Sequence, residues 1–320
     1  MEPVYDVCDN GSSAYADIQD AIDDDATGDT ITVSAGVYDA IYIGPTDEVT
    51  LIGEDAATTN IFGGAGTAAE VADGSLSIQG FSARGTRVRP SPAAFFMDGG
   101  SLDVSDVIID ACGGDTVVAQ WNGASVWDSV IIENNSMATD RNLISFIGSG
   151  STTWGHCIIR DNVATAIWDS NTLDVAFENN LVYNNAIAGS FGLRITANYS
   201  GDVDVVNNVI HGNTCTGHTS GAYALQSTNV RNTIVTDHNV GAIFGAAYYS
   251  LFHDNSGGDL SGGDDNLFAD RRFTDAAAGD FTLQADYSPA IDAGDPESRY
   301  DDGDGTQNDI GGYGGPFGSG

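Results

Sequence analysis

Three arginines, Arg160, Arg194 and Arg231, are the residues whose type and setting could do chemistry. Removing the α-proton of a uronate needs a group that neutralises the carboxylate, a base, and a donor for the leaving oxygen. All 10 basic residues of this chain are Arg, so a Lys base is excluded. If the protein is an enzyme, we expect a Ca²⁺-dependent polysaccharide lyase with one of these arginines as the base.

Four tryptophans lie within a short part of the chain, at Trp121, Trp127, Trp154 and Trp168. Packing in the core or against turns is the default prediction for large aromatic side chains. If two of them project outward, their flat rings would form a platform that stacks on the apolar faces of pyranoses.

A second candidate ligand site is the arginine-bearing segment with Arg84, Arg87 and Arg89. Guanidinium groups bind carboxylate or sulfate groups through two parallel hydrogen bonds. The alternative is a turn whose arginines neutralise nearby aspartates, which is the more frequent arrangement on a protein surface.

A metal site is predicted near the C-terminus, at Asp301, Asp302, Asp304 and Asp309. Carboxylate and carbonyl oxygens are the ligands that Ca²⁺ prefers, but the segment lacks the Glu that would complete an EF-hand. A solvated acidic loop is the alternative.

Composition narrows the possible partners. The chain of 320 residues has 46 acidic side chains and a net charge of −36, so nucleic acid and anionic membrane surfaces would be repelled. No apolar run reaches membrane length, which excludes membrane insertion by a helix.

The four cysteines form no CxxC pair, which disfavours zinc and thioredoxin-like chemistry, and we expect at most one disulfide. The start Met1-Glu2-Pro3 indicates a mature secreted chain without its signal peptide.

The middle of the chain repeats one phrase: a polar or small residue, two or three apolar residues, then Asn or Asp. Copies begin at Asp106, Ser129, His156, Asn180, Asn208, Asn232 and Ser250. The copies recur at unequal intervals of about two dozen residues, and an irregular period of this kind is typical of a solenoid. A coil that spans one such interval holds three short strands and three turns, which favours a single-stranded right-handed parallel β-helix. Asn and Asp tolerate a left-handed backbone, and their side chains can stack as ladders in the turns. We predict such ladder residues at Asn134, Asp161, Asn185, Asn213, Asp237 and Asn255.

The solenoid accounts for the whole chain as one domain. We assign residues 1–30 to an N-terminal cap, 31–260 to β-helix coils and 261–320 to a closing segment. The cap contains a predicted helix over residues 14–25, with Ser13 as N-cap and one apolar face.

Alignment of the phrases places Arg160 in one column with Asp110, Glu133 and Asn184. A cross-coil ion pair with Glu133 is therefore the alternative to a catalytic role for Arg160. His211 and His253 share a column but lie two coils apart, roughly 10 Å at strand spacing, which is too far for direct contact.

Both ends resemble known proteins. Residues Tyr15–Ile22, Gly28–Ile31, Ala35–Tyr38 and Leu51–Glu54 resemble the start of pectate-lyase-like right-handed β-helix proteins. Residues 266–270, 279–283, 288–294 and 309–313 are similar to the closing segment of secreted bacterial β-helix surface proteins. Glycosidases of this fold carry Gly-His-Gly and Arg-x-Lys motifs, which this chain lacks. The resemblance implies a fold and no particular activity.

Three functions follow as hypotheses. The first is a secreted or cell-surface bacterial module, non-catalytic, adhesive or glycan-binding and stabilised by Ca²⁺, whose partner is an extracellular polysaccharide or cell-surface component. The second is a lyase or glycoside hydrolase with an unrecognised site. The third is a self-associating extracellular protein.

Overall fold

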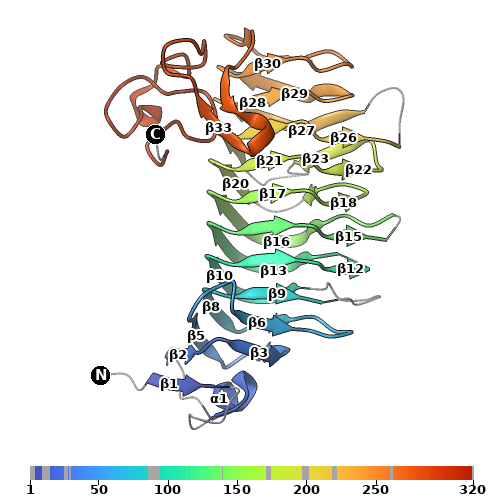
Figure 1. Cartoon of the computed structure of the whole chain (residues 1–320), viewed down its shortest axis with the longest axis vertical. Helices are drawn as coiled ribbons and strands as arrows, with labels where there is room; N and C mark the ends of the chain where they lie inside the picture. Colours follow the sequence, from blue (N-terminus) through green and yellow to red (C-terminus); the bar gives the residue numbers. More distant parts are fainter. Residues whose placement is uncertain are drawn as a thin grey trace. The chain divides into compact units, whose positions relative to one another are not determined.

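The computed structural model describes residues 4–8, 15–24, 28, 30–85, 94–114, 116–138, 140–170, 174–196, 202–217, 222–259 and 262–318. These residues form an all-β parallel solenoid, as predicted (Figure 1). The chain divides into two compact units, which we describe separately. Residues 1–152 and 162–164 form the N-terminal unit, and residues 153–161 and 165–320 form the C-terminal unit. The prediction of a single domain stays a prediction.

Coils of the N-terminal unit contribute strands to three parallel sheets. The first sheet contains β1 (Val4–Val7), β2 (Thr30–Val33), β4 (Ile41–Ile43), β5 (Glu48–Gly53), β7 (Ala69–Ala72), β8 (Ser75–Gln79), β10 (Phe95–Ser105), β13 (Val118–Asp128) and β16 (Ile144–Gly155), whose last three residues belong to the C-terminal unit. The second contains β3 (Gly36–Asp39), β6 (Thr59–Phe62), β9 (Ser82–Arg84), β11 (Ile108–Asp110) and β14 (Ile131–Glu133). The third contains β12 (Gly113–Gly114), β15 (Ser136–Met137) and β18 (Val163–Ala164).

The C-terminal unit repeats this arrangement. Its first sheet contains β19 (Trp168–Ser170), β20 (Asp174–Glu178), β23 (Phe191–Ile195), β24 (Val203–Val206), β27 (Tyr223–Arg231) and β29 (Gly241–Tyr248). Its second contains β17 (Ile158–Arg160), β21 (Leu181–Tyr183), β25 (Val209–His211), β28 (Ile234–Thr236), β30 (Leu251–His253) and β31 (Leu267–Phe268). Its third contains β22 (Ala186–Ile187) and β26 (Thr214–Cys215).

The repeated apolar phrase forms the second sheet, and its central residue points into the coil. Ile109 and Ile132 are paired in the N-terminal unit, and both are 0% exposed. In the C-terminal unit the equivalent column, also 0% exposed, is Ile159, Val182, Ile210, Val235 and Phe252. Alternation on a strand sends its neighbours to the outer face.

That outer face is also buried in the C-terminal unit, which explains why the phrase is apolar at consecutive positions. The closing segment, with β32 (Phe273–Asp275), β33 (Asp280–Leu283) and the 3₁₀ turns η1 (Ala276–Ala278) and η2 (Ser298–Tyr300), lies against it (Figure 1). The packed residues of the sheet and of the closing segment are Leu181, Tyr183, Val209, Ile234, Leu251, Phe273, Phe281, Ala290 and Ile310.

An amide ladder follows the second sheet in each unit. Its members are Asn135 and Asn162 in the N-terminal unit, and Asn185, Asn213, His238 and Asn255 in the C-terminal unit. The prediction is confirmed for Asn185, Asn213 and Asn255. For Asn134, Asp161 and Asp237 the expected left-handed backbone is confirmed, with φ of 55°, 56° and 60°. Only their predicted ladder position is wrong, because the ladder residue is the one that follows each of them.

A one-residue alignment error explains these misses. The phrases that we began at Asn180, Asn208 and Ser250 start one residue earlier in the structure, at the left-handed Asn179, Asn207 and Tyr249. For the same reason Arg160 pairs in register with Tyr183, and the predicted column with Asn184 is wrong.

A second polar ladder, the Asn180 ladder, follows the first sheet of the C-terminal unit. Each backbone N–H donates to the side chain one coil further on. The donor–acceptor pairs are Cys157–Asn180 (2.9 Å), Asn180–Asn208 (2.9 Å), Asn208–Thr233 (3.3 Å), Thr233–Ser250 (3.1 Å) and Ser250–Asn266 (3.0 Å). Buried backbone groups in these turns are thereby satisfied.

The N-terminal helix exists but is shorter than predicted. α1 spans Ile18–Asp23, and the carboxylate of Asp17 caps it by accepting the N–H of Gln19 at 3.0 Å. The predicted N-cap Ser13 lies outside the described residues. Ile18, Ala21 and Ile22 are buried, and the role of the helix as a cap stays a prediction.

The four cysteines form no disulfide with one another. Across the described ranges, no helix is long and apolar enough to cross a membrane.

Candidate functional site

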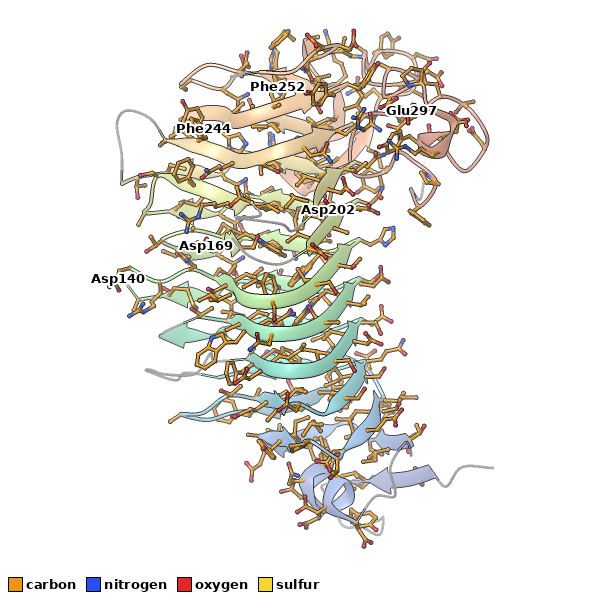
Figure 2. All side chains as sticks on the ribbon, turned by 180° about the vertical axis from the view of Figure 1, so that it is seen from behind. Asp140, Asp169, Asp202, Phe244, Phe252 and Glu297 are labelled. Carbon is orange, nitrogen blue, oxygen red and sulfur yellow. The ribbon has the colours of Figure 1, made fainter. Side chains whose placement is uncertain are left out.

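The first sheet of the C-terminal unit places an ion pair and an aromatic ring in one register column. Asp169, Arg194, Gln226 and Phe244 are neighbours along this column. Arg194 donates from Nε and from a terminal nitrogen to the two oxygens of Asp169, at 2.8 and 2.6 Å. Asp169 and Phe244 lie along the same side of the unit in Figure 2. The pair thus presents a fixed, partly exposed guanidinium.

Three rings form an aromatic strip on the same sheet, Phe191, Tyr223 and Phe244. Phe191 and Tyr223 are paired in register, and their rings are stacked with centroids 6.2 Å apart. The ring of Phe244 lies 5.4 Å from that of Tyr223 and is 49% exposed. Phe191 and Tyr223 are half-buried, so the coils hold their rings in place.

Gly241 gives the strip its shape. It occupies the register position after Tyr223, and a Cβ at this glycine would lie 2.7 and 2.8 Å from two ring atoms of Tyr223. The Tyr223 ring therefore lies where a side chain at position 241 would otherwise project.

The strip and the ion pair together suit a sugar. Flat apolar rings offer contact area to the apolar face of a pyranose, while fixed polar groups beside them can bind hydroxyl or carboxylate oxygens. Both donor groups of the Arg194 guanidinium that face Asp169 are engaged by its carboxylate, so the ion pair fixes the direction in which the guanidinium points.

The other two candidate bases are also engaged. Arg160 donates to the hydroxyl of Tyr183 at 3.0 Å, and its ion pair with Glu133 stays a prediction. Arg231 pairs with Asp295, and its guanidinium lies over the rings of Tyr248 and Tyr300 at 5.4 and 5.6 Å. The structure brings no two of these arginines to one site.

A charged cluster lies between the second sheet and the closing segment. Asp237 contacts Nδ1 of His211 at 3.1 Å and pairs with Arg271, whose other terminal nitrogen lies 3.5 Å from Nδ1 of His253. Burial opposes ionisation of Asp237, but the His211 hydrogen bond and the charges of Arg271, His211 and His253 outweigh it and lower the pKa. The two histidines are two coils apart, as predicted, and Asp237 and Arg271 bridge them.

The default prediction of core packing is confirmed for three of the four tryptophans, and the alternative of an outward platform is wrong for these three. Trp127, Trp154 and Trp168 are 1%, 0% and 0% exposed, because their rings fill the inside of coils and pack edge-to-face on neighbours. Trp121 is 43% exposed and packs edge-to-face on Phe96. These tryptophans therefore do not form a common outward platform.

Arg84 forms an ion pair with Asp110, with nitrogen–oxygen distances of 2.6 and 2.9 Å, as the surface-neutralisation alternative predicts. Arg87 and Arg89 lie outside the described residues, so the clamp prediction is not addressed for them.

Asp302, Asp304 and Asp309 line one hollow together with Asp292, and Asp301 is not among its lining residues. Burial raises the pKa of Asp302 against the backbone hydrogen bonds from Gly315 and Asp309, and the charges of Asp304 and Asp292 raise it further. Burial and the charges of Asp302, Asp292 and Asp304 likewise raise that of Asp309. Among the described residues, no three His, Cys, Asp or Glu side chains are arranged to hold a metal ion. Ca²⁺ binding at these aspartates therefore stays a prediction.

Sequence reasoning missed the aromatic strip. A usable signal was present, since an aromatic residue lies near the start of the first-sheet strand in successive coils at Phe191 and Tyr223, and Phe244 follows in the next. We aligned the coils on the second-sheet phrase alone, and the segments between phrases differ in length.

Comparisons with known proteins agree with this architecture. The family model described as "Right handed beta helix region" matches residues 93–257, which is more than half of the chain. A pectate lyase structure, Pel9A, has 14% sequence identity and a TM-score of 0.64, over 98% of this chain and 96% of its own. This identity supports a common fold only.

Two further structures are more distant. A pectin methylesterase in complex with a hexasaccharide has 15% identity and a TM-score of 0.40, over 90% of this chain and 98% of its own. The pectin methylesterase PemA from Erwinia chrysanthemi has 15% identity and a TM-score of 0.39, over 89% and 98%. Curated protein sequences give no match. On the extent of the family match, the chain belongs to the right-handed β-helix family.

Proposed function

We propose that this protein is a non-catalytic, secreted or cell-surface module that binds an extracellular polysaccharide on the aromatic strip of Phe191, Tyr223 and Phe244. The observation that carries the proposal is the strip of three contacting rings, one of them 49% exposed, on the sheet that also holds the fixed guanidinium of Arg194. A sugar chain lying along successive coils would meet one ring after another at intervals set by the strand spacing.

The alternative is a polysaccharide lyase with an Arg base. Arg194 and Arg231 pair with carboxylates, and Arg160 donates to a phenol oxygen, so each supports structure in its present environment. This favours binding over β-elimination.

Truncation of the strip is expected to abolish most glycan binding. Loss of a stacked ring is worth about 1 kcal/mol in addition to its contact area, so Tyr223→Ala and Phe244→Ala should each weaken binding roughly tenfold. Affinity electrophoresis in gels that contain neutral glycans or polyuronates measures the retardation. Gly241→Ala should weaken binding as well, since its Cβ would displace the Tyr223 ring.

Tyr287→Ala is the matched control, because Tyr287 is an aromatic residue that is 74% exposed and belongs to the closing segment. Retardation that is equal in wild type, Tyr223→Ala and Phe244→Ala would contradict the strip as the binding site. The wild-type protein should also produce no ultraviolet absorbance from unsaturated uronate ends. A rise in this absorbance would replace the binding proposal with a lyase.

Stabilisation by Ca²⁺ is a separate proposal for the aspartates at 302, 304 and 309. Burial first, and then repulsion by neighbouring aspartates, raise the pKa values of Asp302 and Asp309, and a bound cation would relieve that repulsion. We expect millimolar Ca²⁺ to raise the melting temperature, and Asp302→Asn to remove most of that rise. Asp301→Asn is the matched control: Asp301 does not line the hollow, so this variant should keep the rise in melting temperature. A melting temperature that is the same in Ca²⁺ and in EDTA would refute this proposal and leave the glycan-binding proposal intact.

A further inference from the structure

Two adjoining hollows lie at the closing segment of the C-terminal unit: the first also reaches Ile234 of the second sheet, and the second is lined by closing-segment residues alone. The apolar hollow has a volume of about 240 Å³ and is lined by Ile234, Phe281, Leu283, Ala285, Ile291 and Ile310, with Thr282, Asp309 and Tyr313 as its polar side chains. The acidic hollow, of about 340 Å³, is lined by Asp292, Asp302, Asp304 and Asp309. Ile291, Asp309 and Tyr313 line both, so one ligand can occupy both.

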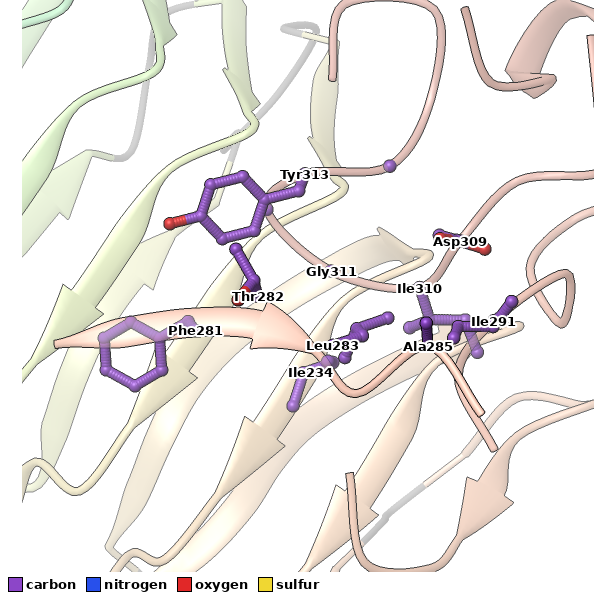
Figure 3. Close-up of a pocket in the computed structure, with 12 residues that line it drawn as sticks. Ile234, Phe281, Thr282, Leu283, Ala285, Ile291, Asp309, Ile310, Gly311 and Tyr313 are labelled. Carbon is purple, nitrogen blue, oxygen red and sulfur yellow. The ribbon is translucent and has the colours of Figure 1, made fainter. Parts of the chain in front are cut away.

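The apolar hollow is large enough for a small ring. A cavity of about 150 Å³ with an apolar lining holds benzene, so about 240 Å³ accommodates a phenyl ring with a short chain. Figure 3 shows Phe281 and Tyr313 on one side of this hollow, and Asp309 beside Ile291 on the other. A ring near Phe281 would therefore direct its chain toward Asp309.

The acidic hollow determines the charge of the ligand. Its four carboxylates have no Arg, Lys or His among the described residues that line either hollow. Backbone N–H groups fix three of them: Asp309 Oδ1 accepts from Asp292 at 2.7 Å, Asp302 Oδ2 accepts from Asp309 at 3.0 Å, and Asp304 Oδ1 accepts from Thr306 at 2.9 Å. Each carboxylate has about four acceptor positions, which leaves several for a cation. Burial and mutual repulsion raise the pKa values of Asp302 and Asp309, and a bound cation would relieve that repulsion.

We propose that these two hollows form one binding site for a small organic amine, with the apolar body of the ligand against Phe281, Leu283 and Ile291 and its ammonium group at Asp309 and Asp302. The site is distinct from the aromatic strip and uses none of its residues. Charge complementarity selects a cation, and the apolar hollow selects an amine that carries a ring or a branched alkyl group.

Isothermal titration calorimetry with phenethylamine, in EDTA to remove divalent ions, tests the site. Phenethylamine should bind at least about tenfold more tightly than 2-phenylethanol, which lacks the charge, and than ethylamine, which lacks the ring. Salt should weaken its binding. Equal affinity for phenethylamine and 2-phenylethanol would overturn the role of the carboxylates, and absence of phenethylamine binding would overturn the site.

Variants locate the binding. Asp309→Asn should weaken phenethylamine binding about tenfold, while Asp301→Asn, outside both hollows, should not change it. Ala285→Phe tests the site without altering a carboxylate, because Ala285 is exposed at the apolar hollow and a ring there would fill it. Unchanged phenethylamine affinity in both Asp309→Asn and Ala285→Phe would place the binding elsewhere.

Discussion

Arg231→Ala is expected to lower the free energy of unfolding by about 3–5 kcal/mol, because it leaves a buried carboxylate without its partner. The side chain of Asp295 is 3% exposed, and Arg231 is its ion-pair partner. Arg231 also stacks on Tyr248 and Tyr300, so the substitution removes packing as well as charge. The contact joins β27 to the closing segment 64 residues later.

Thermal and urea unfolding of three variants would separate these contributions. Arg299→Ala is the matched control, since the side chains of Arg299 and its partner Glu297 are 65% and 62% exposed. An exposed pair of this kind contributes about 0–1 kcal/mol. Asp295→Asn added to Arg231→Ala should recover part of the loss, because it removes the uncompensated charge. Equal effects of Arg231→Ala and Arg299→Ala would show that the buried pair does not hold the closing segment.

The second large effect is a loss of stability in acid that originates at His238. This ring is 1% exposed and replaces an asparagine in the amide ladder. Its Nδ1 lies 3.2 Å from the backbone nitrogen and 3.1 Å from the carbonyl oxygen of Asn213, and its Nε2 lies 3.1 Å from the carbonyl oxygen of Ile210. Burial is the main cause that lowers the pKa of His238 to about 4.

The sign of the pH effect follows from the lowered pKa. Above about pH 6.5, His238 is neutral in both the folded and the unfolded state and contributes no pH dependence. As the pH falls toward about 4, the unfolded state binds a proton that the folded state does not, so stability falls by about 3 kcal/mol in total. Below that pH the folded state binds the proton too, and the loss stops increasing.

His238→Asn isolates this effect, because Asn fills the same ladder position in the neighbouring coils. We expect the stability difference between wild type and His238→Asn to shift in favour of the variant by about 3 kcal/mol between pH 7 and pH 4. Carboxylates that titrate in this range are common to both proteins and cancel in the difference. Parallel stability curves for the two proteins would mean that His238 is not the acid-sensitive group.

The repeat predicts the fold because each apolar phrase has a short-range pattern and stacks on its own copy. Its alignment is ambiguous by one residue, since Asn at the left-handed position and Asn at the ladder position look alike in the sequence. Asn179 and Asn180 are such a pair, with different roles. The buried ladder position accepts His238 as well as Asn, which no rule based on Asn and Asp alone would find.

The sequence did not predict the contacts that the closing segment makes with the repeat. Arg271 meets Asp237, and Arg231 meets Asp295, across the boundary between repeat and non-repeat sequence. Such contacts follow from the path of an irregular segment and have no periodicity. The same holds for the two hollows, whose lining comes mostly from residues 281–314.

The Asn180 ladder has an evolutionary consequence. Each coil of the C-terminal unit offers a side-chain acceptor to the preceding coil and a backbone donor to the following one. Neighbouring coils are therefore connected by equivalent hydrogen bonds. Asn180 and Asn208 are 28 residues apart, and removal of that whole interval would leave Cys157 facing another asparagine. Gain or loss of entire coils is thus compatible with these hydrogen bonds, whereas gain or loss of a single residue within a strand next to the ladder would move that coil's acceptor away from its donor. Length variation among descendants of such a chain should therefore occur in whole coils, or within the segments that lie outside the ladders.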